Sequence, residues 1–171
     1  MENTKYTVLE GNRLKIENLT NRNLIYRNFS GKPSQYNKDG ARKFTLVIDD
    51  METAQRIASY GWNVKMRPSK NDGEEPFCTL DVRIRLDLDF ARPKIKQFTR
   101  NNSIWITEDN IGNFDDVEFE RVDLVLRQYV WKNMKGETGV SAQLAEMYAK
   151  IAEGVLEAKW AEEEYPGEDE D

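Results

Sequence analysis

The stretch FCTLDVRIRLDLDF, residues 77 to 90, decides the fold class. Apolar side chains occupy every second position from Leu80 to Phe90, and Asp and Arg side chains occupy the positions between them. Because successive side chains of a strand point to opposite faces, one face of this segment is apolar and the other is polar. The pattern predicts a strand that packs on a core with one face and meets water with the other.

Further segments with strand composition lie on both sides of this stretch. They are residues 23–29, 42–49, 62–68, 103–107 and 117–131. Loops with turn-forming residues separate them at 30–41, 68–76 and 132–139. Residues 140–151 leave two alternatives open, because their Ala and Glu content favours a helix whereas the preceding hairpin signal favours a strand.

One internal helix is predicted after residue 49. Asp49 or Asp50 can cap its N-terminus, Ala54 and Ile57 belong to an apolar stripe, and Gly61 stands where a helix commonly ends. Five or more strands with one helix indicate a small β-barrel or a sandwich. We predict a mainly β fold, an OB-like antiparallel β-barrel with one inserted helix.

The charge of the chain is unevenly distributed. The net charge is −6, and residues 161–171, AEEEYPGEDED, hold seven acids and no base. Subtracting these seven from 31 acids leaves 24, against 25 Lys and Arg, so residues 1–160 carry a net charge of +1. We predict one OB-like domain over residues 1–160 and a disordered acidic tail over residues 161–171.

Several classes of function are excluded by composition. The chain has no histidine and a single cysteine, Cys78, which removes Ser-His-Asp and Cys-His catalysis and cysteine-rich zinc sites. It contains no phosphate-binding or dinucleotide-binding glycine motif. No apolar run is long enough for a membrane span, and the N-terminus lacks the layout of a signal peptide. We expect a cytosolic protein with no cofactor and no metal.

Residues 92–100, RPKIKQFTR, carry the strongest functional signal. In a strand, Lys94, Lys96 and Phe98 share one face with Arg92 and Arg100. Cations at this spacing can follow a nucleic-acid backbone while the ring stacks on a base, an interaction that barely depends on the identity of the base. The alternative is a solvated strand face with the ring turned into the core.

Basic and aromatic residues also alternate or cluster in three other segments. In each of them, a core aromatic residue beside a surface base is the alternative interpretation, and Trp105 is expected in the core. Arg83 and Arg85 are expected to pair with Asp81 and Asp87. The candidate nucleic-acid-binding residues are Arg27, Phe29, Lys32, Tyr36, Arg42, Trp62, Lys65, Arg67, Arg92, Lys94, Lys96, Phe98, Arg100, Arg127, Tyr129, Trp131 and Lys132.

Two other functions remain as alternatives. Carboxylate pairs at 87–89 and 118–120, and the Glu-x-Lys spacing at 157–159, would suit a Mg²⁺-dependent nuclease. A protein that binds other proteins or has a structural role is the other alternative. The acidic tail is predicted to compete with DNA for the basic surface or to recruit partners, against the alternative of a tail that only maintains solubility. The sequence leaves a homodimer possible.

The strings RNFSGKPSQYNKDGARKF at 27–44, GWNVK at 61–65, RPKI at 92–95 and VDLVLRQYVW at 122–131 carry a family resemblance. Together with the acidic end, they resemble phage single-stranded DNA-binding proteins with an OB-fold, over residues 22–150. The resemblance implies a barrel that coats single strands in the host cytoplasm during replication and recombination, and a C-terminus that contacts replication proteins. Such tails often finish on an apolar residue, whereas this one finishes Glu170-Asp171.

Overall fold

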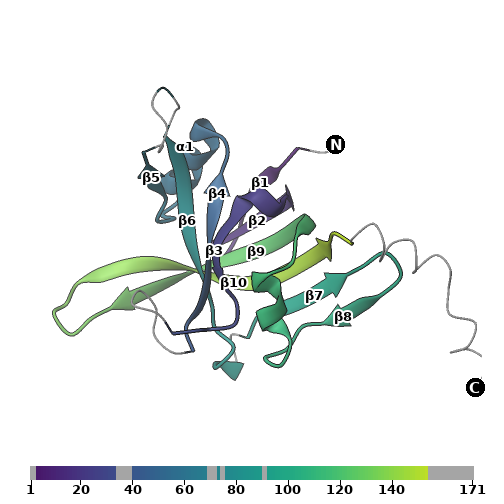
Figure 1. Cartoon of the computed structure of the whole chain (residues 1–171). Helices are drawn as coiled ribbons and strands as arrows, with labels where there is room; N and C mark the ends of the chain where they lie inside the picture. Colours follow the sequence, from purple (N-terminus) through teal and green to yellow (C-terminus); the bar gives the residue numbers. More distant parts are fainter. Residues whose placement is uncertain (1–2, 34–39, 69–72, 74–75, 90–91, 154–171) are drawn as a thin grey trace, which may run out of the picture.

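The computed structural model describes residues 3–33, 40–68, 73, 76–89 and 92–153. The predicted acidic tail lies outside these residues. Ten strands, one α-helix and two short 3₁₀ helices make up the described fold (Figure 1). The elements are β1 Lys5–Leu9, β2 Arg13–Leu19, η1 Asn21–Asn23, β3 Leu24–Asn28, β4 Arg42–Ile48, α1 Met51–Ser59, β5 Lys65–Arg67, β6 Phe77–Ile84, β7 Lys94–Phe98, β8 Ser103–Trp105, η3 Ile111–Asp115, β9 Phe119–Lys132 and β10 Thr138–Ile151.

The strands form one sheet in the order β1-β2-β9-β10-β6-β4-β3. β2 lies next to one end of this order and β3 forms the other end, and the chain runs from β2 through η1 directly into β3. The chain itself therefore connects the two ends of the sheet. The described pairs, including β9 with β10, are antiparallel except two: β10 runs parallel to β6 and to β7. The result is the predicted five-stranded barrel, with β2 and β3 together as its first strand, followed by β4, β6, β9 and β10.

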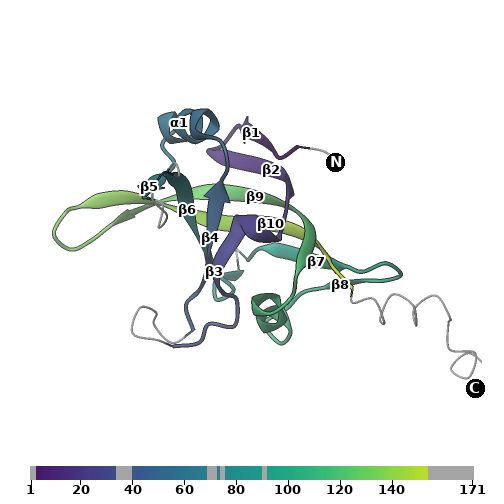
Figure 2. The same cartoon turned by 45° about the horizontal axis from the view of Figure 1, so that its top comes forward.

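Two strand pairs extend beyond the barrel. The β9–β10 hairpin continues past it as a long arm, and β7 with β8 forms a second arm that projects to the other side (Figures 1 and 2). Both β9 and β10 have 14 residues, so each strand contributes to the barrel and to an extension. Residues 140–151 are therefore strand, which settles the open alternative.

The helix follows the local sequence signals. Asp50 is the N-cap, and its side chain accepts a hydrogen bond from the Thr53 N–H at 3.1 Å. Ala54 and Ile57 are its buried residues, and the chain turns away at Gly61 with φ of +97°. Glycine suits this position because a positive φ costs it little.

Some strand boundaries differ from the predictions. β6 ends at Ile84 rather than at 90, because Ile84 pairs with Arg42, the first residue of β4, and the ladder has no partner beyond it. The segment predicted as a strand at 62–68 is reduced to Lys65–Arg67. β1 and β2 were not predicted, since the first twenty residues are polar at many positions.

Candidate nucleic-acid interface

Four cationic side chains line up across five strands on the outer face of the barrel. Lys43 on β4 lies opposite Arg83 on β6, and Arg83 lies opposite Gln143 on β10. Gln143 lies opposite Arg127 on β9, which in turn lies opposite Arg13 on β2. We call these five residues the cationic row. Four strand spacings of about 4.8 Å give it a length of about 19 Å along the sheet.

The four cations of the row lie on the outer side of their strands, whereas Gln143 between them is buried. The preceding or following residue on each strand is buried, for example Val82 beside Arg83 and Leu126 beside Arg127. Gln143, only 3% exposed, accepts a hydrogen bond from Arg127 Nε at 3.4 Å, so the amide holds this guanidinium in place. Within the described residues, Arg83 takes part in no ion pair. The row therefore presents positive charge to an approaching polyanion.

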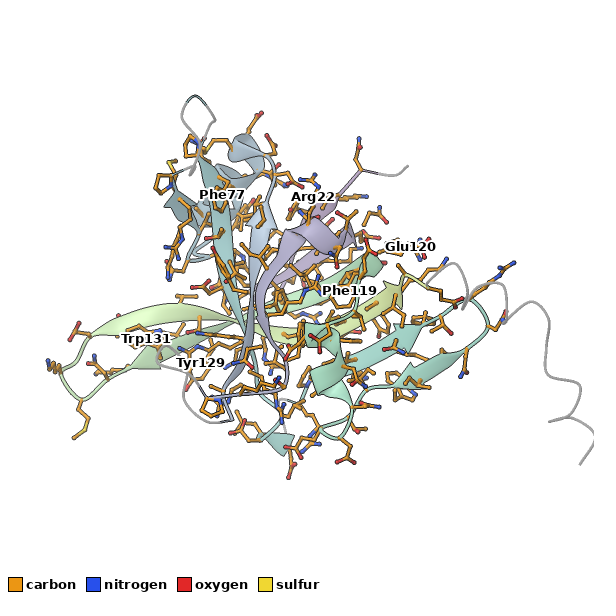
Figure 3. All side chains as sticks on the ribbon, viewed as in Figure 1. Arg22, Phe77, Phe119, Glu120, Tyr129 and Trp131 are labelled. Atoms are coloured by element: carbon orange, nitrogen blue, oxygen red, sulfur yellow. The ribbon has the colours of Figure 1, made fainter. Side chains whose placement is uncertain are left out.

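Two aromatic side chains continue the face of Arg127 along the β9–β10 arm. Tyr129 and Trp131 are 49% and 37% exposed, and Figure 3 shows both on this arm, at the opposite end of β9 from Phe119. Trp131 lies opposite Gly139 in the ladder. A Cβ atom on Gly139 would lie 2.3 Å from Cζ2 of the indole, so the ring rests directly on the glycine.

Arg85, directly after β6, is engaged by a carboxylate. Its guanidinium donates two hydrogen bonds to Asp87, each of 2.9 Å, as the sequence predicts. This pairing raises the pKa of Arg85, to which the Tyr129 phenol also contributes, and lowers the pKa of Asp87. Release from Asp87 would free the Arg85 guanidinium for a phosphate.

The predicted pairing of Arg83 with Asp81 is wrong. Asp81 accepts hydrogen bonds from Thr45, directly opposite on β4, at 2.9 Å and from Lys65 at 3.1 Å. Burial raises the pKa of Asp81, and these bonds outweigh that effect and lower it. Sequence reasoning thus missed Arg83 as a candidate and counted Lys65, which already has a partner.

The predicted strand at RPKIKQFTR forms a second group of basic and aromatic residues. Lys94, Lys96 and Phe98 share the outer side of β7, whereas Ile95 is buried, as alternation predicts. The Lys96 ammonium lies 5.6 Å from the Phe98 ring centroid and 4.9 Å from the Trp105 ring. Trp105 is 56% exposed, so its predicted place in the core is wrong. β8 pairs with β7 alone among the described strands and is exposed throughout.

Two predicted stacking residues are core residues instead. Phe29 is fully buried, stacked on Phe44 at 5.4 Å and edge-on to Phe114 at 5.5 Å. Trp62 is buried as well. Neither ring can stack on a base in this conformation, and both predictions are wrong. Arg42 donates from Nη1 to the Phe29 carbonyl at 2.7 Å, which holds it against the backbone.

Arg27 has a structural role that contradicts its prediction as a phosphate contact. Its guanidinium donates to the carbonyl groups of Leu24, Val117 and Asn21 at 3.0, 2.6 and 3.2 Å. It also lies 4.5 Å from the centre of the Phe119 ring. Burial lowers the pKa of Arg27. The side chain thus ties β3 to the segment before β9 and is not available to DNA.

The remaining predicted residues are spread over several elements. Arg92 forms an exposed ion pair with Asp89 at 3.7 Å. Tyr36 lies outside the described residues. The other four are exposed on the loop after β3, on β5, after β7 and at the end of β9, namely Lys32, Arg67, Arg100 and Lys132.

The structure also exposes residues that sequence reasoning did not select. Arg13 and Lys43 enter the cationic row through register alone, and no local pattern marks them. Tyr26 is 69% exposed, where a register shift between β3 and β4 turns it outward. Arg121 and Lys150 lie opposite one another on β9 and β10, near Phe98.

The described residues contain neither a cluster of metal-ligating side chains nor a candidate membrane-spanning helix. They contain no group of three or more acidic, Cys or His side chains placed to hold a metal ion. Asp87 of the predicted carboxylate pairs is bound to Arg85. No helix in the part of the chain that the structure describes has the length and hydropathy that crossing a membrane requires.

Residues 4–171 match the model of a family described as a putative phage ssDNA-binding domain. This chain belongs to that family. The family match supports a phage single-stranded DNA-binding function, and the architecture above is an OB-type barrel. No curated protein matches the sequence.

Two solved structures of a phage single-stranded DNA-binding protein share the fold. The protein from bacteriophage Enc34 superposes with a TM-score of 0.56 and 13% identity, over 90% of this chain and 89% of its own. The same protein in complex with ssDNA gives a TM-score of 0.56 and 11% identity, over 90% of this chain and 94% of that one. At identities this low, the structural similarity demonstrates a shared fold alone.

Proposed function

We propose that this member of the phage ssDNA-binding family binds single-stranded DNA on the outer barrel face, across the cationic row and onto the β9–β10 arm. The observation that carries the proposal is the register that places Lys43, Arg83 and Arg127 in one cross-strand row on the outer surface of the sheet. Tyr129 and Trp131 follow Arg127 at alternate positions of β9. OB-folds commonly bind oligonucleotides on the face of their second and third strands, between two flanking loops. Here the second and third barrel strands are β4 and β6, and the arm is the extension of the fourth and fifth strands, β9 and β10.

Binding with little sequence preference follows from the chemistry of this face. Lys and Arg attract phosphates, which are identical in every nucleotide. Tyr129 and Trp131 offer flat rings, and every base has a face that can stack on them. The complex of the Enc34 protein with ssDNA supports this use of the fold. Sequence-independent coating of single strands suits DNA replication and recombination in the cytoplasm of a phage-infected host.

The role of the protein is proposed to be non-enzymatic. In the part of the chain that the structure describes, basic and aromatic residues occur without a group of acidic side chains placed to hold a metal ion, which favours binding over phosphodiester cleavage. Incubation of labelled single strands with the protein and Mg²⁺ tests this, and the strands should stay intact. Cleavage products that form with the protein and Mg²⁺ but not with Mg²⁺ alone would support the nuclease alternative.

The acidic segment 161–171 is proposed to compete with DNA for the cationic row or to recruit replication proteins. The segment carries seven acids, and residues 1–160 carry a net charge of +1 with four cations gathered in the cationic row. Attraction between the segment and the row is expected, because both belong to one chain and the effective concentration is high. DNA, with its denser charge, would displace it. A segment released in this way would be free for partner proteins.

Titration of fluorescent oligo-dT at several NaCl concentrations tests the proposed function. Four phosphate contacts at the cationic row, each contributing about 0.7, predict a log–log slope of about −2.8. Arg83→Ala should make the slope shallower by about 0.7. Arg56→Ala, which removes a positive charge from α1, is the matched control and should leave the slope unchanged. Salt-independent binding, or equal slopes for both variants, would contradict the proposal.

A further inference from the structure

A cavity at the far end of β9 from the arm lies outside the cationic row. Its volume is about 340 Å³, within the range of small-molecule pockets. Three strands meet there on their outer faces, and its walls come from the end of β7, the start of β9 and the end of β10. The lining residues are Phe98, Thr99, Arg121, Asp123, Tyr148 and Lys150.

One cross-strand row of the cavity combines two cations with a ring. Arg121 on β9 lies opposite Lys150 on β10, and Lys150 lies opposite Phe98 on β7. All three side chains are exposed, and Phe98 is 36% exposed. A guanidinium and an ammonium can hold a phosphate, and the ring beside them can stack on the attached base. These are the two chemical features of a nucleotide within a single strand.

The acids around this cavity already have partners. Asp123 accepts a hydrogen bond from the Asn18 N–H at 2.8 Å. Glu120 pairs with Lys150 at 3.5 Å, and both side chains are about half exposed. Such a surface pair contributes little stability, so a phosphate can replace the carboxylate. The cavity lining therefore carries two positive charges, from Arg121 and Lys150, against the one negative charge of Asp123.

We propose that this cavity is a second subsite for single-stranded DNA, which holds one nucleotide with its phosphate on Arg121 and Lys150 and its base on Phe98. The inference rests on the proposed function, since the same strand would cross the cationic row. Arg121 and Arg127 are six residues apart on one strand, a separation of about 20 Å. An oligonucleotide whose length is taken up by the row, about 19 Å long, cannot also cover the further distance of about 20 Å to the cavity, whereas a longer one can.

Dependence on oligonucleotide length tests the subsite. OB-folds cover about 4 to 16 nucleotides, so dT oligomers of about 5 and about 16 nucleotides represent the two cases. The double variant Arg121→Ala/Lys150→Ala should bind the short oligomer like the wild type. On the long oligomer its log–log salt slope should become shallower by about 1.4, from two phosphate contacts of about 0.7 each. Phe98→Ala should weaken only the long complex, by about fivefold or more, without a change of slope.

The matched control for the subsite is Arg83→Ala, which should weaken binding of both oligomers. The subsite is refuted if the Arg121/Lys150 variant binds the long oligomer like the wild type, or if it weakens both lengths equally. In either case an effect of Arg83→Ala would leave the proposed function intact. Loss of all oligo-dT binding by the wild type would instead overturn the proposed function. Unchanged melting temperatures establish that the variants are folded.

Discussion

The substitution Gly139→Ala should weaken binding to single-stranded DNA by displacing Trp131 without removing it. The new Cβ would lie 2.3 Å from Cζ2 and 2.5 Å from Cε2 of the indole. Ordinary contact begins at 3.4 Å, so the ring must move by more than about 1 Å. Gly139 does not have a positive φ, so the strand backbone accepts alanine. The change also restricts the unfolded chain, which favours the folded state by about 0.4–1 kcal/mol.

The magnitude of the effect is bounded by complete loss of the ring. Stacking of one base is worth about 1–3 kcal/mol, so Trp131→Ala should weaken binding by about five- to 150-fold. Gly139→Ala should fall between this value and the wild type, because a displaced ring can stack only partly. Fluorescence anisotropy with labelled oligo-dT gives the affinities, and thermal unfolding should give an unchanged or slightly higher melting temperature.

Met134→Ala at the fully exposed tip of the arm is the control for this experiment and should bind DNA like the wild type. The geometric reasoning is wrong if Trp131→Ala weakens binding while Gly139→Ala does not. If neither variant changes the affinity, Trp131 does not contact DNA. A large loss of stability in Gly139→Ala would show that the indole is held by the fold of the arm and cannot move aside.

Four further perturbations separate binding residues from structural ones. Asp87→Asn should free Arg85, tighten binding to oligo-dT and steepen the log–log salt slope by about 0.7; an unchanged slope would show that Arg85 stays away from DNA. Removal of residues 161–171 should tighten binding at low salt and matter less as salt screens the charges, whereas equal affinity at low salt would exclude competition. Phe29→Ala should lower the free energy of unfolding in urea by about 3–5 kcal/mol, because it empties a core position. Tyr129→Ala should change the free energy of unfolding by less than about 0.5 kcal/mol while it weakens binding, and the reverse result for this pair would invert their assigned roles.

The alternation of side chains correctly predicted which residues share a face of a strand. It placed Lys94, Lys96 and Phe98 on the outer side of β7, and it placed Arg127 with Tyr129 on the outer side of β9. These predictions held because the two-residue period of a strand is a local property of the backbone. The cap of α1 at Asp50 is local in the same sense.

Burial of single aromatic residues depended on distant segments. Phe29 is in the core because Phe44 and Phe114 cover it, and Trp105 is exposed because β8 belongs to an arm that no described element covers. Composition alone does not distinguish the buried ring of Phe29 from the exposed ring of Trp105. Arg27 likewise resembles a surface cation in the sequence, and only the convergence of the Leu24 and Val117 carbonyl groups makes it structural.

By itself, the sequence determined a mainly β protein with amphipathic strands, a capped helix, basic and aromatic strand faces, and a family resemblance to phage single-stranded DNA-binding proteins. Only the tertiary structure decided that Arg13, Lys43, Arg83 and Arg127 lie in one row, and that Arg121 and Lys150 meet Phe98. The physical reason is register: a shift of two residues leaves every face pattern intact but changes every cross-strand neighbour.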